Sequence, residues 1–245
     1  MSKTLIITGA SKGIGNAIAK EFQRNGYQVI SLSRTKGENM EGITQIECDL
    51  SDLENLQSTF ITLLSDLKPT ITESITLLNN AGSLGLINKL ENIDYQNIIK
   101  TVNINYTAPL LLNSLFIKET ERWNVQRKIR TISSGAANGS YDGWSVYCST
   151  KAAVDRMTAV IGVEQENKNN PVHAIAIYPG VVDTGMQAQI RNSSEDEFSN
   201  VARFKAMKAE NQLASPQEVA TIIYQMENDT SIKNGAIVDV RKYNP

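Results

Sequence analysis

Seven short runs of apolar residues recur along the chain, and most of them are apolar at nearly every position. Runs of this kind, rich in Val and Ile and bounded by glycine or polar residues, predict strands that are covered on both faces. The runs lie at residues 4–7, 27–32, 43–48, 75–78, 129–132, 172–178 and 236–240.

Segments with apolar residues at helical spacing separate these runs. Residues 52–67 are the clearest example, because Asp52 is a helix-capping residue and Leu56 and Phe60 fall on one face after it. Gly26 is expected to end the first helix. The predicted helices are residues 16–22, 52–67, 95–121 with a break only at Pro109, 144–165 and 216–228.

Strands that alternate with helices predict an α/β fold. Right-handed crossovers then give a doubly wound, Rossmann-type parallel sheet of seven strands with helices on both faces, and ligands bind at the carboxyl ends of the strands. The composition does not shift midway and no internal repeat occurs, so residues 1–245 are expected to form a single domain.

The composition is that of an ordinary globular protein, with 41% hydrophobic and 20% charged residues. The formal net charge is −2 at pH 7 and no Lys/Arg cluster stands out, so we expect neither nucleic acid nor a membrane surface as a partner. No apolar run is long enough to cross a bilayer, and the first ten residues lack the pattern of a signal peptide.

The chain has two cysteines, Cys48 and Cys148, and a single histidine, His173. The cysteines are far apart and belong to no Cys/His cluster, so we predict neither a disulfide nor a metal site, and expect a cytoplasmic protein. His173 lies in a predicted strand and is expected to be structural rather than catalytic.

A glycine-rich turn at residues 8–15 joins the first strand to the first helix. Its glycines, Gly9, Gly13 and Gly15, follow the spacing G-x-x-x-G-x-G and allow the backbone to approach a pyrophosphate closely. The helix that starts near Gly13 directs its unpaired N–H groups and the positive end of its dipole to the same place. The turn therefore predicts a dinucleotide site.

The end of the second strand indicates which dinucleotide is preferred. An acidic residue here would bind the ribose hydroxyls of NAD, but the chain has Ser33 followed by Arg34. A guanidinium binds a phosphate through two charge-assisted hydrogen bonds, and Lys12 on the glycine turn provides a second cation. This pattern favours NADPH/NADP. The alternative is that Arg34 and Lys12 are ordinary solvated loop cations.

Tyr147 and Lys151 lie four residues apart near the start of a predicted helix and therefore on one face of it. A tyrosine with a pKa of about 10 is a poor acid at neutral pH. A nearby ammonium and the positive charge of an oxidised cofactor stabilise the phenolate and lower that pKa, which makes proton exchange feasible. The alternative is a helix-surface pair without a chemical role.

Further motifs follow in a recognisable order. Residues 79–82 read Asn-Asn-Ala-Gly, residues 179–184 read Pro-Gly-Val-Val-Asp-Thr, and Asp49 and Leu50 follow the third strand. With the glycine turn and the Tyr147 pair, they make the chain resemble the short-chain dehydrogenase/reductase family over nearly its whole length. Taken singly, Asp49 would be an ordinary capping acid and the Gly and Pro positions ordinary turns.

The resemblance implies roles for individual residues. Ser134, thirteen residues before Tyr147, would hold the carbonyl oxygen of the substrate, and Asn103 would hold a water in a proton relay through Lys151. Ser133 and Asn105 are neighbouring alternatives. The cofactor-binding residues it implies are Gly9, Ser11, Lys12, Gly13, Ile14, Gly15, Arg34, Asp49, Leu50, Asn80, Ala81, Gly82, Tyr147, Lys151, Pro179, Gly180, Val182 and Thr184.

The residues expected around the substrate resemble a narrower group within the family. Residues 141–148 and 183–187 are similar to those of the sepiapterin reductase branch and of the bacterial benzil reductases that form (S)-benzoin. The substrate residues implied are Ser134, Trp144, Tyr147, Met186 and Asp239. Asp239 corresponds to the aspartate that anchors the pterin ring in sepiapterin reductases, and it can equally be a capping acid at the end of the last strand.

Residues 185–214 form a long insertion, polar at 191–197 and then helical with Phe198 and Phe204 on one stripe. The insertion either closes over the substrate or packs on the domain as an amphipathic helix. The resemblance also implies a homodimer, possibly a homotetramer, formed through the apolar faces of the helices that contain Leu110 and Tyr147, although core packing explains the same residues.

The sequence thus predicts a dinucleotide-binding oxidoreductase, an NADPH-dependent carbonyl reductase. Its small-molecule substrate would be an aromatic ketone or α-dicarbonyl, benzil-like or sepiapterin-like. Two alternatives stay open at this point. One is an alcohol dehydrogenase of the same family that acts in the oxidative direction, and the other is a non-catalytic NADP(H)-binding sensor.

Overall fold

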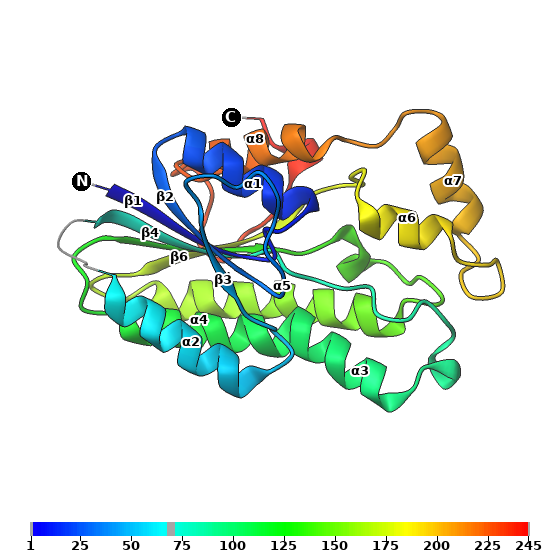
Figure 1. Cartoon of the computed structure of the whole chain (residues 1–245), viewed down its shortest axis with the longest axis horizontal. Coiled ribbons are helices and arrows are strands. Elements are labelled where there is room, and N and C mark those ends of the chain that lie inside the picture. Colours follow the sequence, from blue (N-terminus) through cyan, green and yellow to red (C-terminus); the bar gives the residue numbers. More distant parts are fainter. Residues whose placement is uncertain (1, 68–71, 245) are drawn as a thin grey trace.

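A parallel sheet of seven strands lies between two layers of helices in the computed structural model, which describes residues 2–67 and 72–244 (Figure 1). The strand order is β3-β2-β1-β4-β5-β6-β7, so the chain winds outward in one direction from β1 and in the other from β4. The predicted doubly wound α/β fold is confirmed, and its switch point lies between β1 and β4.

All seven predicted strands are present, with ends that differ from the predicted ones by a few residues. They are β1 Ser2–Thr8, β2 Tyr27–Ser33, β3 Thr44–Glu47, β4 Thr72–Asn79, β5 Gln126–Ile132, β6 Val172–Tyr178 and β7 Ile237–Asp239. The last strand is the shortest, because the chain turns into a 3₁₀ helix, Val240–Lys242, directly after it.

The helices cover both faces of the sheet. They are α1 Gly13–Arg24, α2 Leu53–Asp66, α3 Tyr95–Val102, α4 Ala108–Glu119, α5 Ser145–Gln165, α6 Gly185–Arg191, α7 Val201–Ala209 and α8 Pro216–Met226. Figure 1 shows α1 and α8 on one face and α2, α4 and α5 on the other. Successive residues of β1 reflect this, since Ile6 packs on the side of α2 and α4 whereas Leu5 and Ile7 pack on the side of α1.

The helix predicted at residues 95–121 is divided, but not by Pro109. A π-helical turn, Asn103–Thr107, separates α3 from α4, and Ala108 N–H donates to the Asn103 carbonyl oxygen across it. Pro109 lies in the first turn of α4, where a missing N–H does not break the helix. The wider turn changes which side chains face the site, as described below.

The insertion after β6 contains two helices instead of the single helix predicted. The apolar pattern does not reveal α6, because only Gln187 and Ile190 of that helix are buried. Phe198 was predicted to be helical but lies between α6 and α7. The ends of the insertion are joined, since Asp183 N–H donates to the Ala214 carbonyl oxygen at 3.0 Å.

His173 was expected to be structural, and it does not line the cavity described below. His173 lies on β6, and its Nε2 is 2.8 Å from the Ile232 carbonyl oxygen. Cys48 and Cys148 are free thiols. Among the described residues, no group of His, Cys, Asp and Glu side chains is placed to hold a metal ion, and none of the described helices has the length and apolar character that a membrane span requires.

Candidate active site

The carboxyl ends of the central strands open into a cavity of about 960 Å³. Its walls include Gly9 after β1, Ser33 at the end of β2, Asn80 after β4 and Ser133 after β5. This is the place that the strand order predicts for a ligand. All eighteen residues that the family resemblance assigned to cofactor binding line this cavity.

The glycine turn is shaped so that a ligand can come close to the backbone. Gly9 and Gly13 have φ values of +70° and +61°, in the region that favours glycine. A Cβ on Gly9 would also lie 2.8 Å from the Cα of Ala81. No side chain caps the first turn of α1, so its N–H groups are available to a phosphate at the cavity wall.

Asn80 fastens the segment after β4 to the glycine turn. Its side-chain amide donates to the carbonyl oxygens of Thr8 at 3.0 Å and Gly9 at 2.9 Å. In return, the Thr8 hydroxyl accepts the N–H groups of Asn80 and Ala81, each at 3.1 Å. The Asn-Asn-Ala-Gly motif therefore fixes the turn from β1 against the end of β4.

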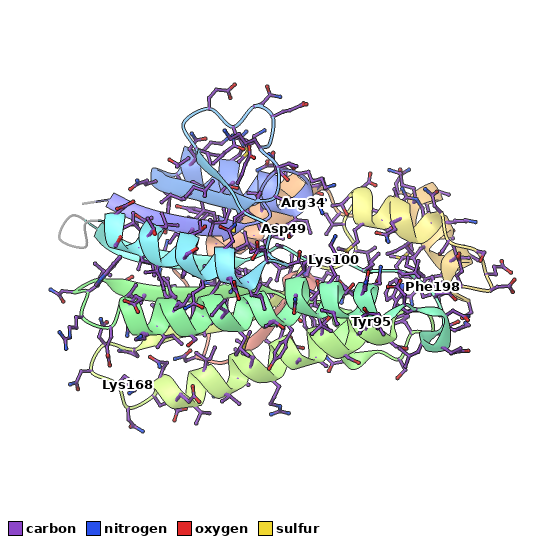
Figure 2. All side chains as sticks on the ribbon, turned by 60° about the horizontal axis from the view of Figure 1, so that its bottom comes forward. Arg34, Asp49, Tyr95, Lys100, Lys168 and Phe198 are labelled. Carbon is purple, nitrogen blue, oxygen red and sulfur yellow. The ribbon has the colours of Figure 1, made fainter. Side chains whose placement is uncertain are left out.

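One end of the cavity is rich in cations. Lys12, Arg34 and Lys100 line it together with Asp49, and Figure 2 shows Arg34, Asp49 and Lys100 near one another. Two hydrogen bonds from Ser51 hold the pKa of Asp49 below its usual range, and the charges of Arg34 and Lys100 act in the same direction. Sequence reasoning missed Lys100, because it lies on the exposed side of a helical pattern with no motif around it.

Ser134, Tyr147 and Lys151 meet at the floor of the cavity. Tyr147 and Lys151 are buried on the first turns of α5, and Ser134 follows β5. Ser134 lies close enough to Tyr147 for its side chain to lower the pKa of the phenol. Lys151 Nζ donates to the Ile132 carbonyl oxygen at 2.8 Å and lies 5.8 Å from the centroid of the Tyr147 ring.

Burial controls the pKa values of these groups. It raises the pKa of Tyr147, against the smaller effect of the hydrogen bond with Ser134. It lowers the pKa of Lys151 to about 8, against the field of Asp155. The predicted lowering of the Tyr147 pKa is thus not achieved by the protein's own groups, because desolvation dominates and the ammonium is directed at Ile132.

The structure places Asn105, and not Asn103, near Lys151. The Asn103 side chain faces away and donates to the Ser51 carbonyl oxygen at 3.5 Å. Asn105 is buried and donates to Ser83 O at 2.8 Å and Thr150 Oγ1 at 3.1 Å. The assignment of Asn103 was wrong because the π-helical turn between the two asparagines was not predicted.

Asn105 and Lys151 both lie close to Gly82. A Cβ on Gly82 would lie 3.5 Å from Lys151 Nζ and 3.7 Å from Asn105 Oδ1. Lys151 on α5 and Asn105 on the π-helical turn thus approach Gly82 from two different elements.

An aromatic cluster forms the other end of the cavity. Trp144 and Met186, two of the residues expected around the substrate, line it together with Tyr141 and Phe204. The Trp144 ring lies edge-on to Tyr147, with centroids 5.7 Å apart. Phe198 of the insertion, labelled in Figure 2, stacks on the Trp144 ring. The insertion therefore packs over the wall beside Tyr147.

Asp239 does not line the cavity and is engaged by Arg241. The guanidinium donates to Asp239 Oδ1 at 2.9 Å and to Oδ2 at 2.6 Å, and Arg241 N–H donates to Oδ1 at 3.0 Å. The reading of Asp239 as a substrate residue is therefore wrong, and its alternative as a capping acid holds. Arg241 lines the cavity instead, with its side chain against Gly180.

Comparisons with known proteins agree with this geometry. The model of the short chain dehydrogenase family matches residues 3–195. The chain is 37% identical to benzil reductase ((S)-benzoin forming) from Bacillus cereus over 244 residues, which cover 96% of this chain and 98% of the relative. It is 40% identical to benzil reductase ((S)-benzoin forming) from Bacillus subtilis (strain 168) over 240 residues, covering 97% and 98%.

More distant similarities point the same way. Sepiapterin reductase from Bos taurus is 26% identical over 259 residues, covering 98% of this chain and 95% of that protein. The crystal structure of a short chain dehydrogenases/reductase from Saccharomyces cerevisiae has a TM-score of 0.82 at 24% identity, covering 98% and 97%. The yeast structure supports the fold alone. The sequence similarities to benzil reductases and to sepiapterin reductase confirm the predicted resemblance to these two branches.

Proposed function

Because the chain belongs to the short chain dehydrogenase family, we propose that it is an NADPH-dependent carbonyl reductase that acts on aromatic ketones or α-dicarbonyls. The observation that carries this proposal is the meeting of Ser134, Tyr147 and Lys151 in one cavity with the glycine turn. A hydroxyl, a phenol and an ammonium at one point are the groups that a carbonyl reduction requires.

The residues of the cavity fit a nicotinamide dinucleotide. A Cβ at Gly9 would collide with Ala81, so the glycine lets the turn pack closely on the segment after β4, and the first turn of α1 offers its N–H groups to a pyrophosphate at the cavity wall. Gly180 and Thr184 line the cavity and would border the nicotinamide. Thr184 lies close to the glycine turn, since a Cβ on Gly13 would be 3.6 Å from Thr184 Cγ2. When bound, the cofactor supplies the hydride that reaches the carbonyl carbon.

The chain's own residues complete the reduction. Ser134 donates a hydrogen bond to the carbonyl oxygen and stabilises the negative charge that develops on it. Tyr147 gives its phenolic proton to that oxygen, so the carbonyl gains one hydride and one proton and becomes an alcohol. Lys151 stabilises the phenolate that is left, because its ammonium lies beside the Tyr147 ring.

Three cations and one missing acid support NADPH over NADH. Lys12, Arg34 and Lys100 line the cavity where a 2′-phosphate would lie, and Ser33 occupies the place of a ribose-binding acid. The Ser33 hydroxyl accepts Ala10 N–H at 3.0 Å, which ties the end of β2 to the glycine turn. A phosphate at this position would make charge-assisted hydrogen bonds to the guanidinium.

The aromatic wall supports a substrate with an aryl group. Tyr141, Trp144 and Phe204 present ring faces and edges against which an aromatic ketone can pack. Two relatives at 37% and 40% identity are benzil reductases, and benzil is an α-dicarbonyl with two phenyl groups. A sepiapterin-like substrate is less well supported, because Arg241 holds Asp239 outside the cavity.

We also propose a homodimer. Leu110 on α4 and Val160 and Val163 on α5 are exposed apolar side chains on neighbouring helices of one layer. Such residues are costly to leave in water, and a second copy would cover them. The molar mass from light scattering tests this proposal.

A direct assay tests the enzymatic function. Purified protein should oxidise NADPH, followed by its absorbance, when benzil is added. Tyr147→Phe removes the proton donor but keeps the ring, and it should lower turnover by several orders of magnitude. Unchanged turnover in Tyr147→Phe would refute the assignment, as would failure of wild type to reduce any carbonyl in a panel of diketones.

A further inference from the structure

A buried carboxylate lies one turn beyond the catalytic lysine. Asp155 follows Lys151 by four residues on α5, so both point to the same side of the helix. Asp155 is only 7% exposed and does not line the cavity. A buried acid without a partner is costly, so its surroundings should explain why it is there.

Segments after β5 and β6 meet α5 around this carboxyl group. The Tyr178 hydroxyl at the end of β6 donates to Asp155 Oδ2, and Asn138 Nδ2 donates to the same hydroxyl at 2.9 Å. The Ser133 hydroxyl after β5 donates to the Lys151 carbonyl oxygen at 3.4 Å, one helical turn before Asp155. Asn138 ends the turn that begins after Ser134, and Tyr178 directly precedes the Pro-Gly motif.

The hydroxyl of Tyr178 is a donor, which favours the ionised form of the acid. A carboxylate accepts hydrogen bonds and has none to give, so this hydroxyl stabilises its charge. Burial acts in the opposite direction and raises the pKa of Asp155. Lys151, one turn away, favours the charged form as well.

The charge of Asp155 acts back on Lys151. Burial lowers the pKa of Lys151 to about 8, and Asp155 provides the opposing field. Of the other titratable groups near the pair, Tyr147 on α5 is buried and Tyr178 on β6 is held by Asp155. Asp239 on β7 acts on Tyr178 rather than on Lys151. Among the described residues, Asp155 is therefore the acid that stabilises the buried ammonium.

We propose that Asp155 is a positioning residue that keeps Lys151 cationic beside Tyr147 and joins the segments after β5 and β6 to α5. The ammonium is buried and donates to the Ile132 carbonyl oxygen, so its charge depends on a nearby opposite charge. The importance of Asp155 for turnover rests on the proposed function. The effect of Asp155 on the titration of Lys151 can be measured without cofactor or substrate.

Titration of Lys151 by NMR tests the proposal directly. With lysine labelled with ¹³C at Cε, the signal of Lys151 is identified by its loss in Lys151→Arg. The wild-type signal should titrate near pH 8. In Asp155→Asn, which keeps the shape but removes the charge, the midpoint should fall by about one pH unit or more. An unchanged midpoint overturns the proposal.

Two further variants separate charge from packing. Thr158→Val removes another buried hydroxyl of α5, one that donates to the Val154 carbonyl oxygen at 2.9 Å, and it should leave the Lys151 midpoint unchanged. An equal shift in Thr158→Val would mean that any disturbance of α5 moves the titration, which contradicts a specific role. If Asp155→Asn does not fold, Asp155→Ser carries the same expectation.

The pH profile of benzil reduction gives the functional readout. In Asp155→Asn, the alkaline limb of kcat should move to lower pH by the same interval as the NMR midpoint, while activity at pH 6 stays within a few-fold of wild type. A uniform loss at all pH values would indicate a merely structural role and overturn the proposal. If wild type reduces no carbonyl but the NMR shift is present, the proposed function fails and the effect of Asp155 on Lys151 stands.

Discussion

The indole ring of Trp144 stacks on the ring of Phe198, with centroids 4.6 Å apart and planes inclined by 9°. Phe198 belongs to the insertion and is fully buried, whereas Trp144 lines the cavity beside the catalytic tyrosine. Asp142, two residues before Trp144, accepts the Ser199 hydroxyl at 2.7 Å, so the insertion is joined to this wall at two adjacent points. The insertion thereby orients an aromatic surface that faces the substrate.

Replacing Phe198 with leucine should weaken substrate binding selectively. Leucine keeps most of the apolar volume but loses the stacking, which is worth about 0.5–1.5 kcal/mol. We expect the KM for benzil to rise about two- to tenfold, with the KM for NADPH unchanged. Phe60→Leu, on the buried face of α2, is the matched control, since it should reduce stability without changing either constant. Equal changes for both substrates in Phe198→Leu would contradict an orienting role.

Cofactor preference should depend on Arg34. Loss of a charge-assisted hydrogen bond costs about 1.5–3 kcal/mol, or roughly ten- to hundredfold in affinity. Arg34→Ala should therefore raise the KM for NADPH by that factor and change the KM for NADH little. Lys36→Ala is a suitable control, because Lys36 is exposed, lies 3.9 Å from Glu47 and does not line the cavity. A similar rise for both cofactors would show that Arg34 does not contact the phosphate.

The sequence predicts those parts of the site that depend on local spacing. The glycine turn and the Tyr147 and Lys151 pair each lie within one strand-to-helix junction or one helical turn, so their geometry follows from the element itself. The seven strands and their parallel order likewise follow from uninterrupted apolar runs between helices.

Other parts of the site depend on contacts that no local pattern contains. The π-helical turn Asn103–Thr107 has ordinary helical periodicity around it, so the sequence could not show which asparagine faces Lys151. Asp155 gains its surroundings from β6 and from the turn after β5, which meet only in the folded chain. The pairing of Asp239 with Arg241 was easier to predict from the sequence, because an aspartate side chain commonly accepts a hydrogen bond from the backbone N–H two residues later.

The asparagine assignment leads to a paired comparison. Asn105→Ala removes the hydrogen bonds to Ser83 and Thr150 next to Lys151, each worth about 0.5–1.5 kcal/mol, and should lower kcat about tenfold or more. Asn103→Ala removes one long bond to Ser51 and should leave kcat within about twofold of wild type. Steady-state rates with NADPH and benzil decide between the two asparagines. A larger loss of kcat in Asn103→Ala than in Asn105→Ala would support the original assignment of Asn103.

The pH dependence of stability should reveal His173, far from the catalytic residues. Burial lowers the pKa of His173, and the neighbouring charge of Arg130 adds to this effect. Arg130 Nη1 lies 3.3 Å from Nδ1 of His173, and Nε2 lies 2.8 Å from the Ile232 carbonyl oxygen. The neutral ring with its hydrogen on Nε2 satisfies both contacts, whereas a second proton on Nδ1 would face the guanidinium.

The unfolded chain therefore binds a proton at His173 more readily than the folded protein does. As the pH falls through the unfolded value of about 6.5, the unfolded state gains protons first, so the free energy of unfolding decreases. Each unit of pKa difference contributes about 1.4 kcal/mol. Urea unfolding at pH 7.5 and pH 5.5 measures this loss, and His173→Gln, which cannot take up the proton, should show a smaller difference between the two. If the variant loses as much stability on acidification as wild type does, the loss arises from other groups.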